Sequence, residues 1–338
     1  GRAAIGTGVL TGTDNTAIGQ SAGNDLTSGA YNFFGGYRAG WNATTPSHTI
    51  AIGRLAIGLG VLTGADNVAI GYQTGYDLTS GTYNIFSGYQ AGANVTTGIG
   101  NVFSGYQAGE FATTSNYAIA IGHNAIGLGV LTGTDNTAIG RGAGADLTSG
   151  TYNNFIGNGA GANVTTADNT VAIGRDAIGL GVLTGTDNIA VGYNAGYDLT
   201  SGHSNVLTSY RAGFNLTTGT YNVLTGYQAG LNATTSSHTI AIGYNAIGAG
   251  VLTGSQNTAI GREAGQDLTS GANNNFMGYR AGFNATTGSQ NIALGYQAIG
   301  LGVLTGIENI AIGRGAGLDL TSGTYNNFMG YQAGANAT

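Results

Sequence analysis

The chain repeats one short unit along its whole length, and this repeat limits the folds that are open to it. Glycine closes segments such as 15–19, 67–71 and 101–105, and we call the equivalent positions the anchor positions. They fall at residues 1, 19, 36, 53, 71, 88, 105, 122, 140, 157, 174, 192, 209, 226, 243, 261, 278, 295, 313 and 330. Only Ser209 is not glycine, and the repeat has no gap. A sequence of this kind is interpreted first as a repeat architecture.

A second order lies above the first. Thirteen of the spacings are 17 residues, which we call short coils, and six are 18 residues, which we call long coils. The long coils begin at 1, 53, 122, 174, 243 and 295, and each contains a version of the sequence at 56–64. Their separations alternate between 52 and 69 residues, which gives a superrepeat of 121 residues or seven coils. We therefore expect residues 1–338 to form a single continuous domain of about 19 coils without linkers.

A unit of this length is too short for the known helical repeats of about 33–47 residues or for a propeller blade of about 40. Glycine supplies 65 of the 338 residues, and each glycine costs about 1 kcal/mol in a helix relative to alanine. Short β-branched segments such as 67–70, 61–63 and 78–80 predict strands that end at glycine turns. The predicted fold is all-β, a parallel β-solenoid (β-roll or β-helix) in which each coil adds a rung. At ~4.8 Å per rung, the rod would be on the order of 90 Å long.

Composition excludes several classes of function. Charged residues make up 7% of the chain, the net charge is −6, and cysteine is absent. The absence of cysteine removes disulfides, thiolate catalysis and cysteine-bound zinc. Nucleic acid is disfavoured as a partner because so few cations are present to neutralise phosphates. No apolar run approaches the ~20 residues of a membrane-spanning helix, so we expect no membrane insertion.

Asparagine occupies the fourth position before the anchor in 15 of 19 coils. We predict a structural asparagine ladder, in which each amide donates a hydrogen bond to the next coil. Asparagine would also suit the left-handed backbone of a solenoid corner at this position. An alternative is that these amides bind a ligand. The residues are Asn15, Asn32, Asn67, Asn84, Asn101, Asn136, Asn153, Asn188, Asn205, Asn222, Asn257, Asn274, Asn291, Asn309 and Asn326.

The second position before the anchor is always Ala, Phe or Leu, which predicts a core column. The next residue often compensates in size, as in the pairs Ala51–Ile52 and Phe86–Ser87. Because such an exchange keeps the layer volume nearly constant, we expect both columns to lie in the core.

Tyrosine follows the anchor in 11 coils and arginine in six. One interpretation is a solvent-facing ladder stiffened by cation–π contacts. The other is a contact stripe for sister chains or glycan, because Tyr and Arg are enriched at interface hot spots. The candidate contact residues are Tyr37, Tyr72, Tyr89, Tyr106, Tyr193, Arg54, Arg141 and Arg175.

The sixth position after the anchor carries mostly Asp or Asn. The aspartates are Asp25, Asp77, Asp146, Asp198, Asp267 and Asp319. The asparagines all lie in Asn-x-Thr sequons and are candidate N-glycosylation sites of a secreted protein: Asn42, Asn94, Asn163, Asn215, Asn232, Asn284 and Asn336. The alternative is that Asp and Asn are interchangeable corner residues backed by a threonine ladder.

Nothing in the sequence indicates an enzyme. The four histidines (His48, His123, His203 and His238) lie in different coils with no recurring Ser or Asp partner. The aspartates are isolated from one another, and Ca²⁺ needs six or more oxygen ligands. We expect no catalytic residue, no metal and no cofactor.

At the level of Asn-x-Ala-Ile-Gly followed by Tyr-Gln-Ala-Gly, as at 67–75 and 88–92, the sequence resembles two groups of surface proteins. One is the YadA-like head repeats of trimeric autotransporter adhesins. The other is the similar repeats of phage and algal-virus tail-fibre proteins. The resemblance implies a parallel β-roll, commonly a homotrimer, that acts in attachment on a cell or virion surface. This chain differs in its longer coil and its seven-coil superrepeat.

Our first hypothesis is a structural protein that forms a stiff extracellular fibre or filament by coil stacking and self-assembly. Neither end of the sequence departs in composition from the interior, so we expect no capping coils and a segment of a longer fibre or filament. The expected partner is the chain itself, as a trimer or an end-to-end filament. The alternative is an attachment module, an adhesin or tail fibre, that binds glycan or a host surface through the Tyr/Arg or Thr ladders. A third hypothesis is ice binding by a flat array that contains Thr63 and Thr79.

Overall fold

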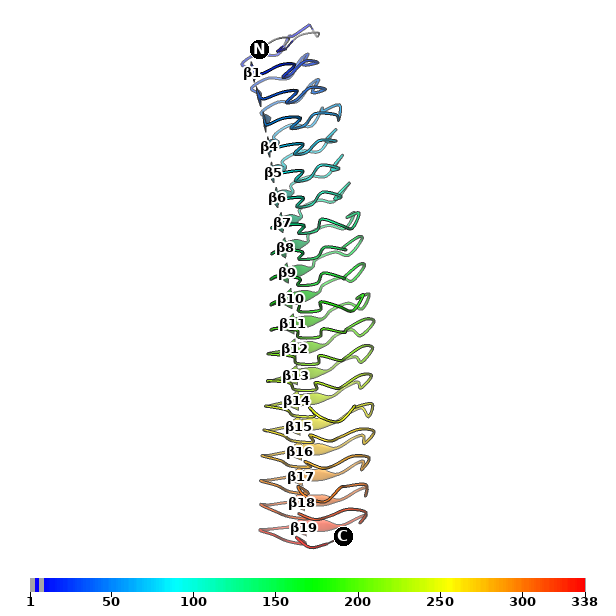
Figure 1. The fold of residues 1–338 in the computed structure, drawn as a ribbon. Helices are drawn as coiled ribbons and strands as arrows, with labels where there is room; N and C mark the ends of the chain where they lie inside the picture. The colour runs from blue at the N-terminus through cyan, green and yellow to red at the C-terminus, as the bar shows by residue number, and fades with distance from the viewer. Residues whose placement is uncertain (1–3, 6–8, 338) are drawn as a thin grey trace. The chain divides into compact units, whose positions relative to one another are not determined.

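The computed structural model describes residues 4–5 and 9–337. These residues form strands and turns and contain no helix. The chain divides into two compact units, Gly1–Asn169 and Thr170–Thr338. In both units the path is a parallel β-solenoid with one strand in each coil (Figure 1), which confirms the predicted fold class.

The strands are all three residues long and lie directly before the anchor positions. The first unit contains β1 (Thr16–Ile18), β2 (Phe33–Gly35), β3 (Ile50–Ile52), β4 (Val68–Ile70), β5 (Ile85–Ser87), β6 (Val102–Ser104), β7 (Ile119–Ile121), β8 (Thr137–Ile139) and β9 (Asn154–Ile156). The second unit contains β10 (Val171–Ile173), β11 (Ile189–Val191), β12 (Val206–Thr208), β13 (Val223–Thr225), β14 (Ile240–Ile242), β15 (Thr258–Ile260), β16 (Asn275–Met277), β17 (Ile292–Leu294), β18 (Ile310–Ile312) and β19 (Asn327–Met329).

Each strand pairs in parallel with the next strand of its unit, and the register advances by one coil. Ala17 of β1 lies opposite Phe34 of β2, for example, and Leu207 of β12 lies opposite Leu224 of β13. Hydrogen bonds between coils continue outside the strands: the Thr27 amide donates to the Thr44 carbonyl at 2.9 Å. The backbone of the turns is therefore satisfied by the same stacking as the strands.

The expected strands at 61–63 and 78–80 are wrong. Among the described residues, pairing outside the named strands is limited to one isolated bridge, between Ala233 and Leu252. In the long coils the amides of Thr63 and Gly64 both donate to the carbonyl of Thr79, so the regular alternation of a β-ladder cannot form. Leu62 and Leu78 are nevertheless fully buried, so these segments contribute to the core without being strands.

The core column is the middle residue of each strand, and the expectation that the next residue shares the core is wrong. Ala51 and Phe86 are buried, whereas Ile52 and Ser87 are exposed. The reason is the two-residue period of a strand, which turns adjacent side chains to opposite faces. The first and third residues of every strand therefore form an outward face, which we call the outer sheet face.

The exchange of large and small side chains occurs instead across the interior of the coil. In short coils a glycine stands four residues after the anchor, and a Cβ at Gly40 would lie 2.6 Å from the Phe34 ring. In long coils that position is isoleucine and the strand residue is alanine, as in Ala51 and Ile57, both fully buried. In these coils the bulk thus lies on one wall of the core or on the other. Six short coils are small at both positions, as at Ala69 and Gly75, and there Phe86 and Ile57 of the neighbouring coils fill the space.

The anchor glycines permit the close approach of successive coils. At Gly36 φ is +131°, and a Cβ there would lie 2.6 Å from the carbonyl oxygen of Gly53. Glycine alone adopts such a backbone without strain. Ser209, the one exception, has φ of +107°, and its hydroxyl group makes no hydrogen bond with the described residues.

The asparagines before the strands form buried hydrogen-bonded runs. The Oδ1 of Asn274 accepts a hydrogen bond from the backbone N–H of Asn291 at 3.0 Å. The Nδ2 of Asn274 donates to the Oδ1 of Asn257 at 3.1 Å and to the Gly288 carbonyl at 2.8 Å. The amide-to-amide bond therefore runs to the preceding coil, and the bond to the next coil ends on a backbone carbonyl. Threonine or alanine takes the place of asparagine at Thr49, Ala118, Thr170 and Thr239.

The left-handed corner lies one residue earlier than expected. Tyr31, His48 and Asp66, each directly before the ladder position, have φ between 54° and 60°. The ladder asparagines themselves do not have positive φ, because their backbone already enters the strand. A second left-handed corner lies two residues after the anchor, as at Gln90 with φ of 53°.

The asparagine ladder predicts a large difference between two adjacent residues. Asn274→Ala removes a fully buried amide and leaves the Gly288 carbonyl and the Asn291 amide unpaired, so we expect a loss of about 2–4 kcal/mol in stability. Asn275→Ala, on the exposed outer sheet face of β16, is the matched control and should change stability little. Thermal unfolding followed by circular dichroism measures both, and equal effects of the two substitutions would contradict the assigned role of the ladder.

Ser209 offers a test of the anchor geometry in the opposite direction. Ser209→Gly relieves a backbone conformation that disfavours side chains, and should raise stability by about 1 kcal/mol. Gly226→Ser, at the next anchor, should lower stability, because its Cβ would lie 2.5 Å from the Gly243 carbonyl oxygen. Urea unfolding of the two variants and the wild type provides the comparison. A destabilised Ser209→Gly protein would show that the serine contributes something that the backbone argument omits.

Candidate functional site

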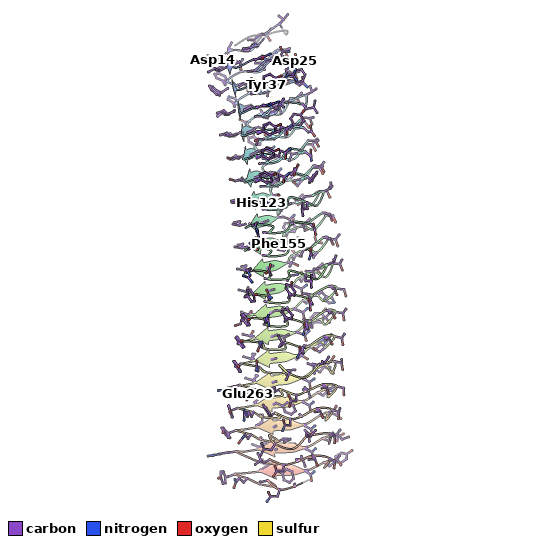
Figure 2. The ribbon with its side chains drawn as sticks, in the orientation of Figure 1. Asp14, Asp25, Tyr37, His123, Phe155 and Glu263 are labelled. Atoms are coloured by element: carbon purple, nitrogen blue, oxygen red, sulfur yellow. The ribbon has the colours of Figure 1, made fainter. Side chains whose placement is uncertain are left out.

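The residues directly after the anchors stack on one another along each unit. In the first unit this stripe, which we call the aromatic stripe, contains Tyr37, Arg54, Tyr72, Tyr89, Tyr106 and His123. Ring centroids of Tyr72 and Tyr89 are 5.1 Å apart, and those of Tyr89 and Tyr106 are 5.0 Å apart. Figure 2 shows the stacked rings between the labelled Tyr37 and His123.

The second unit carries the same arrangement with a longer run. Its stripe contains Arg175, Tyr193, Tyr210, Tyr227, Tyr244, Arg262, Tyr279, Tyr296, Arg314 and Tyr331. Adjacent rings stack at 4.8–5.2 Å between centroids. Arg262 bridges the interruption between Tyr244 and Tyr279, with its guanidinium carbon 5.5 Å and 5.8 Å from the two ring centroids.

Most ring faces in the aromatic stripe contact the neighbouring members of the same stripe. Tyr89, for example, stacks on the rings of both Tyr72 and Tyr106 and is still 43% exposed. Arg175 both packs over Tyr193 at 4.7 Å and donates a hydrogen bond to its hydroxyl group at 2.9 Å. Such pairs contribute about 0.5–1.5 kcal/mol each beyond burial, so the stripe favours a stiff stack.

The column two residues after the anchor is polar and also pairs from coil to coil. The carboxamides of Gln73, Gln90 and Gln107 form a ladder with N–O distances of 3.0 and 3.3 Å. In the second unit Arg280 donates to Glu263 at 2.6 Å, and Arg262 donates to the same carboxylate at 3.2 Å. Glu263 is only 7% exposed, and the hydrogen bond from Arg280 holds the pKa of its carboxyl below the ordinary value, against the opposing effect of burial.

The Asp/Asn column behaves as a set of corner residues. The amides of Asn42 and Asn284 donate to the carbonyls of Leu59 and Leu301, each at 2.8 Å. Burial raises the pKa of Asp77, Asp198 and Asp267 above the ordinary value. Of the sequon asparagines, Asn336 is exposed and the others are half-buried: Asn42, Asn94, Asn163, Asn215, Asn232 and Asn284.

The threonine hydroxyl groups that follow this column are engaged as well. Thr79 donates to the Thr96 carbonyl at 3.0 Å, and Thr200 donates to the Thr217 carbonyl at 3.1 Å. Equivalent bonds recur in both units. These hydroxyl groups therefore hold coils together.

The histidines contact aromatic rings. His48 stacks on Tyr31 at 5.3 Å between centroids and lies 3.6 Å from the Asp66 carboxylate, and His238 stacks on Tyr221 at 5.1 Å. Within 4–5 and 9–337, no group of three or more His, Asp or Glu side chains is placed to hold a metal ion.

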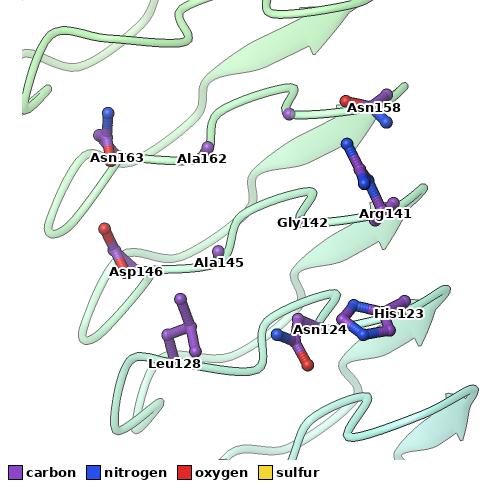
Figure 3. A pocket seen from close by; sticks show the side chains of 11 residues that line it. His123, Asn124, Leu128, Arg141, Gly142, Ala145, Asp146, Asn158, Ala162 and Asn163 are labelled. Atoms are coloured by element: carbon purple, nitrogen blue, oxygen red, sulfur yellow. The ribbon is translucent and has the colours of Figure 1, made fainter.

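One hollow of about 380 Å³ opens in the first unit, where the stripe and the polar column are both interrupted. The stripe positions there are His123, Arg141 and Asn158, and glycine occupies the polar column at Gly142 and Gly159. Figure 3 shows polar side chains on the two sides of the hollow and small residues between them. Asn124 and Arg141 stand on one side, and Asp146 and Asn163 on the other. The sequence predicts Arg141 as a candidate contact residue but contains no signal for the hollow, which depends on several columns at once.

No protein-family model matches the chain, and no curated protein is significantly similar to it. In the part of the chain that the structure describes, no helix is long and apolar enough to cross a bilayer. The assignment of function therefore depends on the geometry of the coils.

The Glu263 cluster predicts a pH-dependent contribution to stability. The pKa of this carboxyl is lowered in the folded chain from an ordinary value of 4.5, so its stabilising effect is present above that value and is lost as the pH falls through the folded pKa. Glu263→Gln should therefore lower the melting temperature at pH 7 and have less effect in acid. Glu308→Gln, an exposed carboxyl with no ion pair among the described residues, serves as the control. If the difference in melting temperature between the wild type and Glu263→Gln is the same at pH 7 and pH 3, the assigned ion pairs are contradicted.

Proposed function

We propose that the chain is a structural protein that forms a stiff extracellular fibre by self-association of its solenoid. The observation that carries the proposal is the outer sheet face, which presents β-branched side chains to solvent in coil after coil. Ile52 and Ile121 are both 39% exposed, and Ile242 is 38% exposed. An apolar surface that extends along successive coils is typical of an interaction site.

A second copy of the chain is the occupant that fits this face. A partner must present side chains at the same rise per coil to cover the face along its length, and another solenoid of the same sequence does so. The face also carries no charge, because its positions are Ile, Val, Thr, Ser, Asn, Leu, Met, Phe or Gly. A homo-oligomer with the outer sheet faces turned toward one another agrees with what the resemblance to trimeric adhesin heads implies.

The internal ladders support a mechanical role for the same assembly. Asparagine, glutamine, threonine and tyrosine columns each join a coil to its neighbours, so bending must disturb several ladders together. The sequence contains nine basic residues, all of them arginine, which leaves few cleavage sites for trypsin-like proteases. These features suit a long-lived extracellular fibre more than a module whose surface must adapt to a partner.

Self-association through the outer sheet face has a direct test. The wild-type chain should sediment as an oligomer in analytical ultracentrifugation and show rods or filaments in negative stain. Ile52→Glu/Ile121→Glu buries charge in the proposed interface and should yield monomer with an unchanged circular dichroism spectrum.

Leu59→Glu/Val61→Glu is the matched control, because these side chains are 49% and 54% exposed but lie on a turn of a long coil outside the sheet. This variant should stay oligomeric. If the control dissociates and the Ile52→Glu/Ile121→Glu variant stays oligomeric, the interface lies at the turns of the long coils and not on the outer sheet face. A wild-type protein that is monomeric or compact would contradict the fibre itself.

A further inference from the structure

The hollow around Arg141 differs from the rest of the aromatic stripe because the guanidinium of Arg141 has no partner among the described residues. Arg54, Arg175, Arg262 and Arg314, at the same column position, each lie over a stripe tyrosine. Arg141 has His123 and Asn158 as its column neighbours, and its side chain makes no ion pair, hydrogen bond or cation–π contact with the described residues. It is exposed, so an uncommitted guanidinium stands at the side of the hollow.

A carboxylate completes the lining on the opposite side of the hollow. The Oδ1 of Asn124 also has no hydrogen-bond partner in the described chain, but it is buried, like the Oδ1 atoms of Asn194 and Asn245 in the same column, and is not within reach of a ligand. Asp146 is half-buried across the hollow and makes no ion pair among the described residues. A ligand must therefore offer an anionic group on one side and hydrogen-bond donors on the other.

We propose that this hollow binds an acidic saccharide residue, a pyranose that carries a carboxylate. The planar carboxylate pairs with the guanidinium of Arg141, which presents parallel donors to it. Ring hydroxyl groups donate to the Asp146 carboxylate on the opposite side of the hollow. The methyl groups of Ala145 and Ala162 lie between the two sides and form a flat apolar floor for the ring (Figure 3).

Size and layout favour a uronic acid over smaller anions and zwitterions. The volume of about 380 Å³ falls within the range of about 300–1,000 Å³ typical of small-molecule sites. A free amino acid bears both charges on one carbon, whereas Arg141 and Asp146 stand on opposite sides of the hollow. A pyranose uronate separates its carboxylate from its hydroxyl groups across the ring. This site goes beyond the fibre role, and its lining residues lie outside the outer sheet face.

The experiment titrates the full-length chain with methyl β-D-glucuronide and follows saturation-transfer NMR and calorimetry. We expect saturable binding in the millimolar range, as for a small ligand with few contacts. Methyl β-D-glucoside, the neutral analogue, should bind with an affinity at least about tenfold lower, because it cannot form the charge-assisted pair.

Two variants locate the site. Arg141→Gln should weaken binding of the glucuronide about tenfold or more, whereas Arg314→Gln should leave it unchanged. Arg314 is a matched control because it also precedes Gly-Ala-Gly, but it packs between Tyr296 and Tyr331. Gly142→Asn should abolish binding by filling the hollow. It should also fold, since no atom lies within 4 Å of a Cβ at Gly142 and Asn124 adopts the same left-handed backbone in the preceding coil.

The proposal is overturned if the wild-type chain shows no saturable binding of the glucuronide, or if the glucoside binds as well. It is also overturned if Arg314→Gln loses as much affinity as Arg141→Gln, or if a folded Gly142→Asn protein binds normally. None of these outcomes depends on the oligomeric state, so failure here is separable from failure of the fibre proposal.

Discussion

Hydrogen bonding of each coil to its neighbours is the constraint on which the rest of the structure depends. Most of the backbone hydrogen bonds join a residue to a neighbouring coil, so successive coils must follow nearly the same path. This is why the anchor position requires glycine. The carbonyl of the next coil lies where a Cβ would stand, 2.6 Å away at Gly36 and 2.3 Å at Gly53. A side chain there would force the coils apart at the point where the strand ends.

The same constraint explains how long and short coils coexist. The extra residue of a long coil is absorbed in the turn, where Leu59 and Val61 project into solvent, and the strand register advances without a break. In the interior, Ile57 stands where the short coils carry glycine, and the strand residue of the same coil is alanine, as at Ala51. The longer turn and the buried isoleucine thus occur together in the sequence that all long coils share.

The sequence predicted the features that depend on period and composition alone. Coil length, parallel stacking, the buried column of the strand and the presence of an asparagine column all follow from like residues that recur at one spacing. Details that depend on side-chain direction could not be obtained in this way. The outward orientation of Ile52 and the donation of Asn274 to the preceding coil require the strand geometry. The place of the left-handed corner, at Tyr31 and not at Asn32, requires the backbone path.

The residues that line the hollow could not be recognised from the sequence, because each of them is ordinary within its own column. Each column, taken by itself, tolerates a histidine, an arginine or a glycine, and nothing marks His123, Arg141 or Gly142 as unusual in sequence. Their effect becomes visible only in the stack, because a polar or aromatic side chain in this solenoid finds its partner mainly in the equivalent side chain one coil away. Where the column continues, tyrosines and amides saturate one another and the surface becomes inert. Where two adjacent columns break in the same coils, as at Arg141 and Gly142, a charged side chain is left without a partner among the described residues. In a chain that stacks on itself, a departure from the repeat therefore changes which side chains have a partner in the neighbouring coil.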